Sequence, residues 1–148
     1  MSLEEKVNGE IKTAMLAKDQ AKLSALRAIK SGLLLLKSEK GGAQITEEME
    51  LKLLQRMVKQ RKESAEMYKS QNRDDLYAEE VSQLEIISLY LPQQMGEEEI
   101  TEALKKMMAD NNITSIRDMG KLMGIASRTF AGKADNKLVS EIVKRLLS

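Results

Sequence analysis

The sequence predicts an all-α protein, and three observations support this class. The 148 residues include a single proline, and only 3% of them are aromatic, so the residue types that favour strands are scarce. Good helix formers, namely leucine, lysine, glutamate and methionine, are abundant. Apolar residues recur along most of the chain at the three-and-four spacing of an amphipathic helix. We expect an amino-terminal multi-helix bundle over residues 1–92 and a small three-helix module over residues 93–148.

Four helices are predicted in the amino-terminal bundle, over residues 3–18, 19–38, 46–70 and 74–91. Thr46 suits the N-cap of the third helix, because three glutamates follow it at the positive end of the helix dipole. Pro92 is expected to end the fourth helix. Arg61 falls within the apolar arc of the third helix and therefore needs a carboxylate partner. The fourth helix offers four candidates: Asp74, Asp75, Glu79 and Glu80.

Three shorter helices are predicted after the linker PQQMG, over residues 97–111, 115–131 and 135–147. Ser115 and Asp135 suit the N-caps of the last two, and Gly132 suits the C′ position between them. A break is expected near Ser127. Glu97, Glu98 and Glu99 resemble part of a magnesium site, but their place in a first helical turn explains them better, because carboxylates stabilise that end of the dipole.

The residue types that are missing exclude much catalytic chemistry. The chain has no histidine and no cysteine, which removes imidazole bases, thiolate nucleophiles, disulfides and conventional zinc sites. We therefore predict no catalytic residue, no metal and no cofactor. The polar amino terminus does not resemble a secretory signal peptide, and the run Leu33–Leu36 is too short to cross a bilayer. A cytoplasmic protein without a membrane partner is the expectation.

Glycines and cations share one face of the helix predicted over residues 115–131. At 100° per residue, five of them fall within about a third of a turn: Arg117, Gly120, Lys121, Gly124 and Arg128. Ile116, Met119, Met123 and Ala126 lie opposite and can face a core. Each glycine within a helix costs roughly 1 kcal/mol relative to alanine, so the pair requires an explanation. Two remain open: close approach of a nucleic-acid backbone, or tight packing against another helix.

The last quarter of the chain is basic. Residues 113–148 carry seven cations and three anions, a net charge of +4. Lys133 and Lys137 flank the amino terminus of the final helix, where free N–H groups favour an anion, and Lys144 and Arg145 follow along that helix. Asp135 can also cap this helix alone, with the lysines simply solvated. The phosphate interpretation adds these four cations to the glycine-bearing face.

The chain also resembles a known family. The segment DMGKLMGIASRTFAGKADNKLV, residues 118–139, is similar to the carboxy-terminal motif of the GatB/YqeY family, and QRKESAEMY, NRDDL, YLPQQM and LRAIKSG extend the resemblance upstream. We identify the chain as similar to the free-standing YqeY-like members. It departs from the family pattern at Asn72 and Asn136, where glycine is common, at Gly96, where serine is common, and at Ser127, which lacks a nearby proline. These departures affect loop detail.

The resemblance implies three hypotheses about function. The matching module of the GatCAB amidotransferase is associated with tRNA, which favours a nonenzymatic RNA-binding accessory protein of translation. The second hypothesis is an adaptor that binds amidotransferase or aminoacyl-tRNA synthetase components. The third, a carbon–nitrogen ligase with glutamine as amido donor, follows from the family label alone, because the chain lacks a glycine-rich nucleotide loop and the amidase signature.

Overall fold

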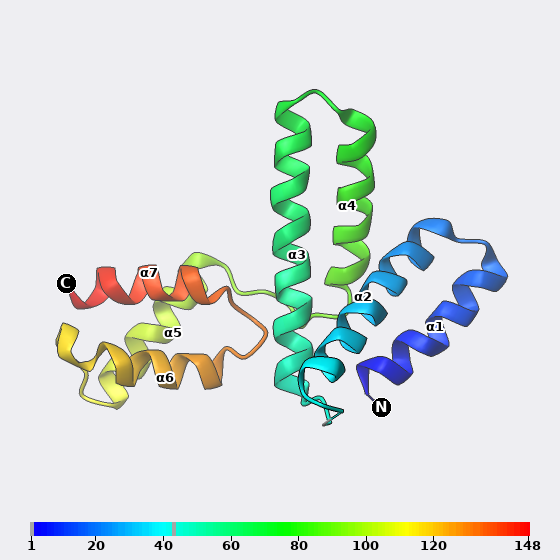
Figure 1. The fold of residues 1–148 in the computed structure, drawn as a ribbon. Helices are drawn as coiled ribbons and strands as arrows, with labels where there is room; N and C mark the ends of the chain where they lie inside the picture. The colour runs from blue at the N-terminus through cyan, green and yellow to red at the C-terminus, as the bar shows by residue number, and fades with distance from the viewer. Residues whose placement is uncertain (1, 43) are drawn as a thin grey trace. The chain divides into compact units, whose positions relative to one another are not determined.

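The computed structural model describes residues 2–42 and 44–148, and every regular element in these two ranges is helical (Figure 1). The prediction of an all-α protein is confirmed. The chain divides into two compact units, Met1–Leu91 and Pro92–Ser148, and each unit has its own apolar core. None of the helices in the described ranges combines the length and apolar character that a bilayer crossing requires.

Two helical hairpins form the first unit (Figure 1). Helix α1, Leu3–Ala17, pairs with α2, Gln20–Glu39, and helix α3, Glu47–Ser70, pairs with α4, Asp74–Ser88. Helix α2 also packs against α4, which joins the hairpins around a core that includes Leu26, Ile29, Leu33, Leu54 and Ile87. The buried stripes predicted from the apolar spacing therefore face this core.

Side-chain caps and left-handed residues explain where these helices begin and turn. The Thr46 hydroxyl accepts a hydrogen bond from the Met49 N–H at 3.2 Å, which confirms it as the N-cap of α3. Between α3 and α4, Asn72 adopts a φ of 58°. Asparagine tolerates this left-handed conformation better than most residues, so the turn forms here without a glycine.

The fourth helix is shorter than predicted. It ends at Ser88, not Leu91. Pro92 explains the difference, because a proline ring clashes with the carbonyl four residues earlier and provides no N–H to bond it. The residue four before Pro92 is Ser88. Because Pro92 cannot donate to the Ser88 carbonyl, that carbonyl accepts from the Leu91 N–H at 3.1 Å instead, and residues 89–91 form a tighter turn after the helix.

Arg61 finds a different partner from the one predicted. It is half-buried, and its Nε donates to the amide oxygen of Gln83 at 3.1 Å, while a second guanidinium nitrogen donates to the Met57 carbonyl at 3.4 Å. The expected carboxylate partner was wrong. Partial exposure lets water solvate the remaining donors, so a neutral amide on α4 suffices.

The second unit packs three helices around a separate core. Helix α5 spans Glu97–Asp110, a short 3₁₀ turn η1 spans Ile116–Asp118, α6 spans Met119–Thr129 and α7 spans Asn136–Leu147. Ile100, Leu104, Leu122, Ile142 and Val143 are fully or almost fully buried between them. The predicted break near Ser127 is wrong, because α6 continues through it to Thr129. The irregularity lies at the other end, where η1 leads into α6.

Candidate nucleic-acid interface

Helix α6 presents its glycines and cations to solvent. Five exposed residues, here called the glycine strip, are Arg117, Gly120, Lys121, Gly124 and Arg128. Leu122 and Ala126, on the opposite side of α6, are both 0% exposed and anchor the helix in the core of the second unit. This burial fixes the rotation of α6 about its axis, and the strip faces outward as a result.

The two glycines of the strip have no steric role within the described structure. A Cβ atom built at Gly120 or Gly124 meets no other atom within 4 Å. An alanine would fit at either position and would be better for the helix by roughly 1 kcal/mol. Packing within the unit, the alternative left open by the sequence, therefore does not account for these glycines.

One residue of the predicted apolar face is placed wrongly by the helical-wheel argument. Ile116 is 52% exposed, whereas Met119 and Met123 are half-buried and Ala126 is buried. Ile116 belongs to the 3₁₀ turn η1 and lies outside α6, which begins only at Met119. The register calculated for a continuous α-helix therefore fails at this residue. Ser115 precedes η1, but its side chain makes no capping hydrogen bond.

The strip cations are free to bind an external anion. Within residues 2–42 and 44–148, no carboxylate lies within 4.0 Å of the charged nitrogens of Arg117, Lys121 or Arg128. Phosphate oxygens accept hydrogen bonds from such donors, and the absence of a Cβ at the glycines leaves room for a backbone to approach them.

The second group of predicted cations lies at and along α7. Lys133, Lys137, Lys144 and Arg145 are all exposed. Asp135 caps α7, as predicted, by accepting a hydrogen bond from the Lys137 N–H at 3.1 Å. Arg145 differs from the other cations because it donates to Glu97 at 3.0 Å. This pair explains part of the acidic first turn of α5, and no group of three or more acidic side chains in the described structure could hold a metal ion.

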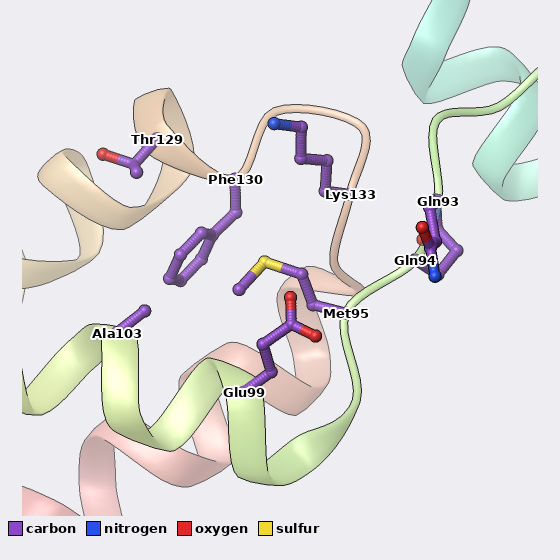
Figure 2. A pocket seen from close by; sticks show the side chains of 8 residues that line it. All are labelled: Gln93, Gln94, Met95, Glu99, Ala103, Thr129, Phe130 and Lys133. Atoms are coloured by element: carbon purple, nitrogen blue, oxygen red, sulfur yellow. The ribbon is translucent and has the colours of Figure 1, made fainter.

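A groove that the sequence did not reveal lies beside the end of α6. It has a volume of about 480 Å³ and receives side chains from three segments (Figure 2). The linker contributes Gln93, Gln94 and Met95, helix α5 contributes Glu99 and Ala103, and the end of α6 with the following loop contributes Thr129, Phe130 and Lys133. Only the fold brings these segments together, so no local motif signals the groove.

Hydrogen bonds hold the linker against the loop that follows α6. The Met95 N–H donates to the Lys133 carbonyl at 2.8 Å, and the Gln94 amide donates to the carbonyls of Pro92 at 2.9 Å and Gly132 at 2.7 Å. Gly132 itself has a φ of 73°, in the left-handed region that glycine adopts without strain. These hydrogen bonds to backbone carbonyls therefore hold the walls of the groove together.

Comparison with known proteins identifies the family. A family model described as Yqey-like protein matches residues 4–147. The chain belongs to the YqeY-like family. The match covers both units, so the family assignment applies to the whole chain and not only to the segment with the glycine strip.

Relatives from fungi carry the name altered inheritance of mitochondria protein 41, mitochondrial. The Pyrenophora tritici-repentis protein is 27% identical over 146 residues, which is 96% of this chain and 79% of the relative. The Saccharomyces cerevisiae S288c protein is 33% identical over 108 residues, which is 69% of this chain and 56% of the relative. The alignment thus spans little more than half of the yeast protein.

These names contradict the cytoplasmic location expected from the sequence. The relatives are named as mitochondrial proteins. The expectation depended on the absence of a secretory signal peptide, whose apolar segment is easy to recognise. Mitochondrial import signals are amphipathic and polar by comparison, so a polar amino terminus does not argue against that organelle.

Proposed function

We propose that this chain is a nonenzymatic RNA-binding protein that docks the phosphate backbone of a structured RNA, tRNA in particular, on the glycine strip. The observation that carries the proposal is the open space around Gly120 and Gly124, flanked by exposed cations. A helix that gives up roughly 1 kcal/mol at each of two positions, with no internal benefit, is best explained by an external backbone that needs close approach.

Lys133, Lys137 and Lys144 extend the proposed surface beyond the strip. Their side chains are exposed, and the two lysines around the α7 amino terminus lie where free N–H groups also favour an anion. Arg145 takes part by exchanging its exposed Glu97 partner for a phosphate, an exchange that costs little because exposed ion pairs are weak. Binding that depends on phosphate contacts should weaken steeply as salt rises.

The test is fluorescence anisotropy with total tRNA and with a duplex DNA control, at low and near-physiological salt. We expect salt-sensitive binding that prefers tRNA. The variant Lys121→Ala/Lys133→Ala/Lys137→Ala should lose up to three phosphate contacts, which lowers the slope of log affinity against log salt by roughly two to three.

A matched control separates the proposed site from overall charge. Lys12, Lys59 and Lys62 are exposed lysines of the first unit, and Lys12→Ala/Lys59→Ala/Lys62→Ala changes the net charge equally. We expect this variant to keep most of the affinity. A folded wild-type protein that binds no RNA, or binds it with no response to salt, would overturn the proposal.

A protein-adaptor role is the second candidate, and exposed apolar side chains of the first unit favour it. Leu16 is 87% exposed, Leu89 79%, Leu35 57% and Leu34 50%. Leu34 and Leu35 are adjacent on α2, so Leu34→Ser/Leu35→Ser removes two of them without touching the core. If this candidate holds, partners that co-purify after ribonuclease treatment will be lost with that variant.

A further inference from the structure

We propose that the groove beside the end of α6 receives one unpaired nucleobase of the RNA that docks on the glycine strip. This inference rests on the proposed function and specifies its substrate: a structured RNA with an extruded nucleotide, not a fully paired helix. The groove of about 480 Å³ lies within the size range of small-ligand sites and can hold a base with its sugar.

The apolar part of the groove suits the faces of a base. Figure 2 shows the Phe130 ring pointing toward Met95 and Ala103, with the methionine thioether beside the ring. Phe130 is 5% exposed and Met95 is half-buried. Methionine is unbranched and flexible, so its side chain can move aside and uncover more of the ring without a backbone change. Aromatic and apolar side chains bind unstacked bases of any sequence in this way.

The polar part of the groove suits the edge of a base and its phosphate. The Gln93 amide offers a donor and an acceptor, Glu99 offers acceptors, and Lys133 adds an ammonium to the lining on the side of the loop after α6 (Figure 2). The edges of bases also present hydrogen-bond donors and acceptors. A phosphate next to the inserted base would lie near Lys133. Gln94 helps to hold the walls of the groove together, because its side-chain amide donates hydrogen bonds to two backbone carbonyls.

Two residues that line the groove directly follow the glycine strip in the sequence. Arg128 is the last cation of the strip, and the next two residues, Thr129 and Phe130, line the groove. An RNA strand that follows α6 toward its carboxyl end therefore reaches the groove directly. In a paired A-form helix the bases are stacked and the major groove is too narrow for side chains, so only an extruded base can enter a concave site.

Three RNA hairpins of one sequence test the inference by fluorescence anisotropy: one fully paired, one with a single bulged nucleotide, and one with an abasic bulge at that place. The abasic bulge keeps the kink and the phosphates but lacks the base. We expect the bulged hairpin to bind about tenfold more tightly than the abasic one, the effect of one stacked base.

Variants within the groove should abolish this preference. Ala103→Leu fills the groove, whereas Ala109→Leu makes the same change at an exposed position of α5 away from the groove and should preserve the preference. Gln93→Ala, at an exposed linker residue, should reduce it without loss of fold. None of the three changes alters charge, so binding of the paired hairpin should stay as in the wild type.

Equal binding of the bulged and abasic hairpins, or a preference that survives both Ala103→Leu and Gln93→Ala, would overturn the groove inference while leaving backbone docking intact. Failure to bind any of the three hairpins at low salt would overturn the proposed function and this inference with it.

Discussion

Gly32 in the first unit and the two glycines of the strip in the second have opposite surroundings. In the first unit, a Cβ atom at Gly32 of α2 would lie 3.0 Å and 3.2 Å from the two methyl carbons of Leu53, so this glycine permits two buried helices to approach. In the second unit, a Cβ atom at Gly120 or Gly124 would meet nothing. The comparison teaches that a helical glycine can permit close approach within the chain, as Gly32 does, and that an open Cβ position does not by itself require an external partner, because Gly9 of α1 has one too.

The largest expected effect concerns the separate cores. Leu54→Ala in the first unit and Leu104→Ala in the second each remove a side chain that is at most 1% exposed, at a cost of about 2–5 kcal/mol. Because each leucine belongs to the core of its own unit, hydrogen exchange should increase mainly in the unit that carries the substitution. An equal increase in both units with either variant would show that they unfold as one body.

The next effect concerns Gly32. Gly32→Ala should destabilise the protein by up to about 2 kcal/mol, because crowding costs about 1–3 kcal/mol and the better helix former returns about 1 kcal/mol. Chemical denaturation measures the change. In a Leu53→Ala background, where the crowding atoms are absent, the same substitution should become stabilising. If Gly32→Ala stabilises the protein with Leu53 in place, Gly32 does not serve packing.

The smallest effect concerns an exposed ion pair of the first unit, Arg73 with Asp75. Arg73 donates two hydrogen bonds of 3.3 Å to Asp75, and this contact, followed by the Leu76 backbone N–H, lowers the pKa of Asp75 below its ordinary value. NMR titration should detect the low pKa of Asp75, and Arg73→Gln should raise it.

A carboxylate with a depressed pKa stabilises the fold above its unfolded pKa, and this contribution is lost as pH falls through the folded pKa. Because both groups are fully exposed, stability should change little. An unaltered pKa in Arg73→Gln would contradict the assigned cause.

Much of the fold could be predicted because it depends on local rules. Helix periodicity, scarce proline and strong N-caps such as Thr46 and Asp135 act within a few residues, and the structure agrees with them. Departures occur where one further interaction decides the outcome. Pro92 cannot donate to the Ser88 carbonyl, which accepts from the Leu91 N–H instead, and Ile116 lies in the 3₁₀ turn before α6, outside that helix.

The candidate site was only partly predictable. The glycine strip follows from helical spacing within one segment: its four residues in α6 are exposed as that spacing predicts, and Arg117 is exposed in the preceding turn η1. The groove beside α6 could not be predicted from helical spacing, because its lining comes from the linker, α5, the end of α6 and the loop after it. The prediction of a partner for Arg61 failed for the same reason, since the choice between Gln83 and the four carboxylates of α4 depends on how α3 and α4 pack.

The most direct test of the account measures stability and RNA affinity together in Gly120→Ala/Gly124→Ala, with Gly9→Ala as the matched control. Gly9 is a glycine of α1 whose Cβ position is also open. Each alanine should stabilise its helix by about 0.5–1 kcal/mol. Only the double variant should lose RNA affinity, by about tenfold, equivalent to about 1.4 kcal/mol. Wild-type RNA affinity in that variant, or a loss of stability, would contradict the account.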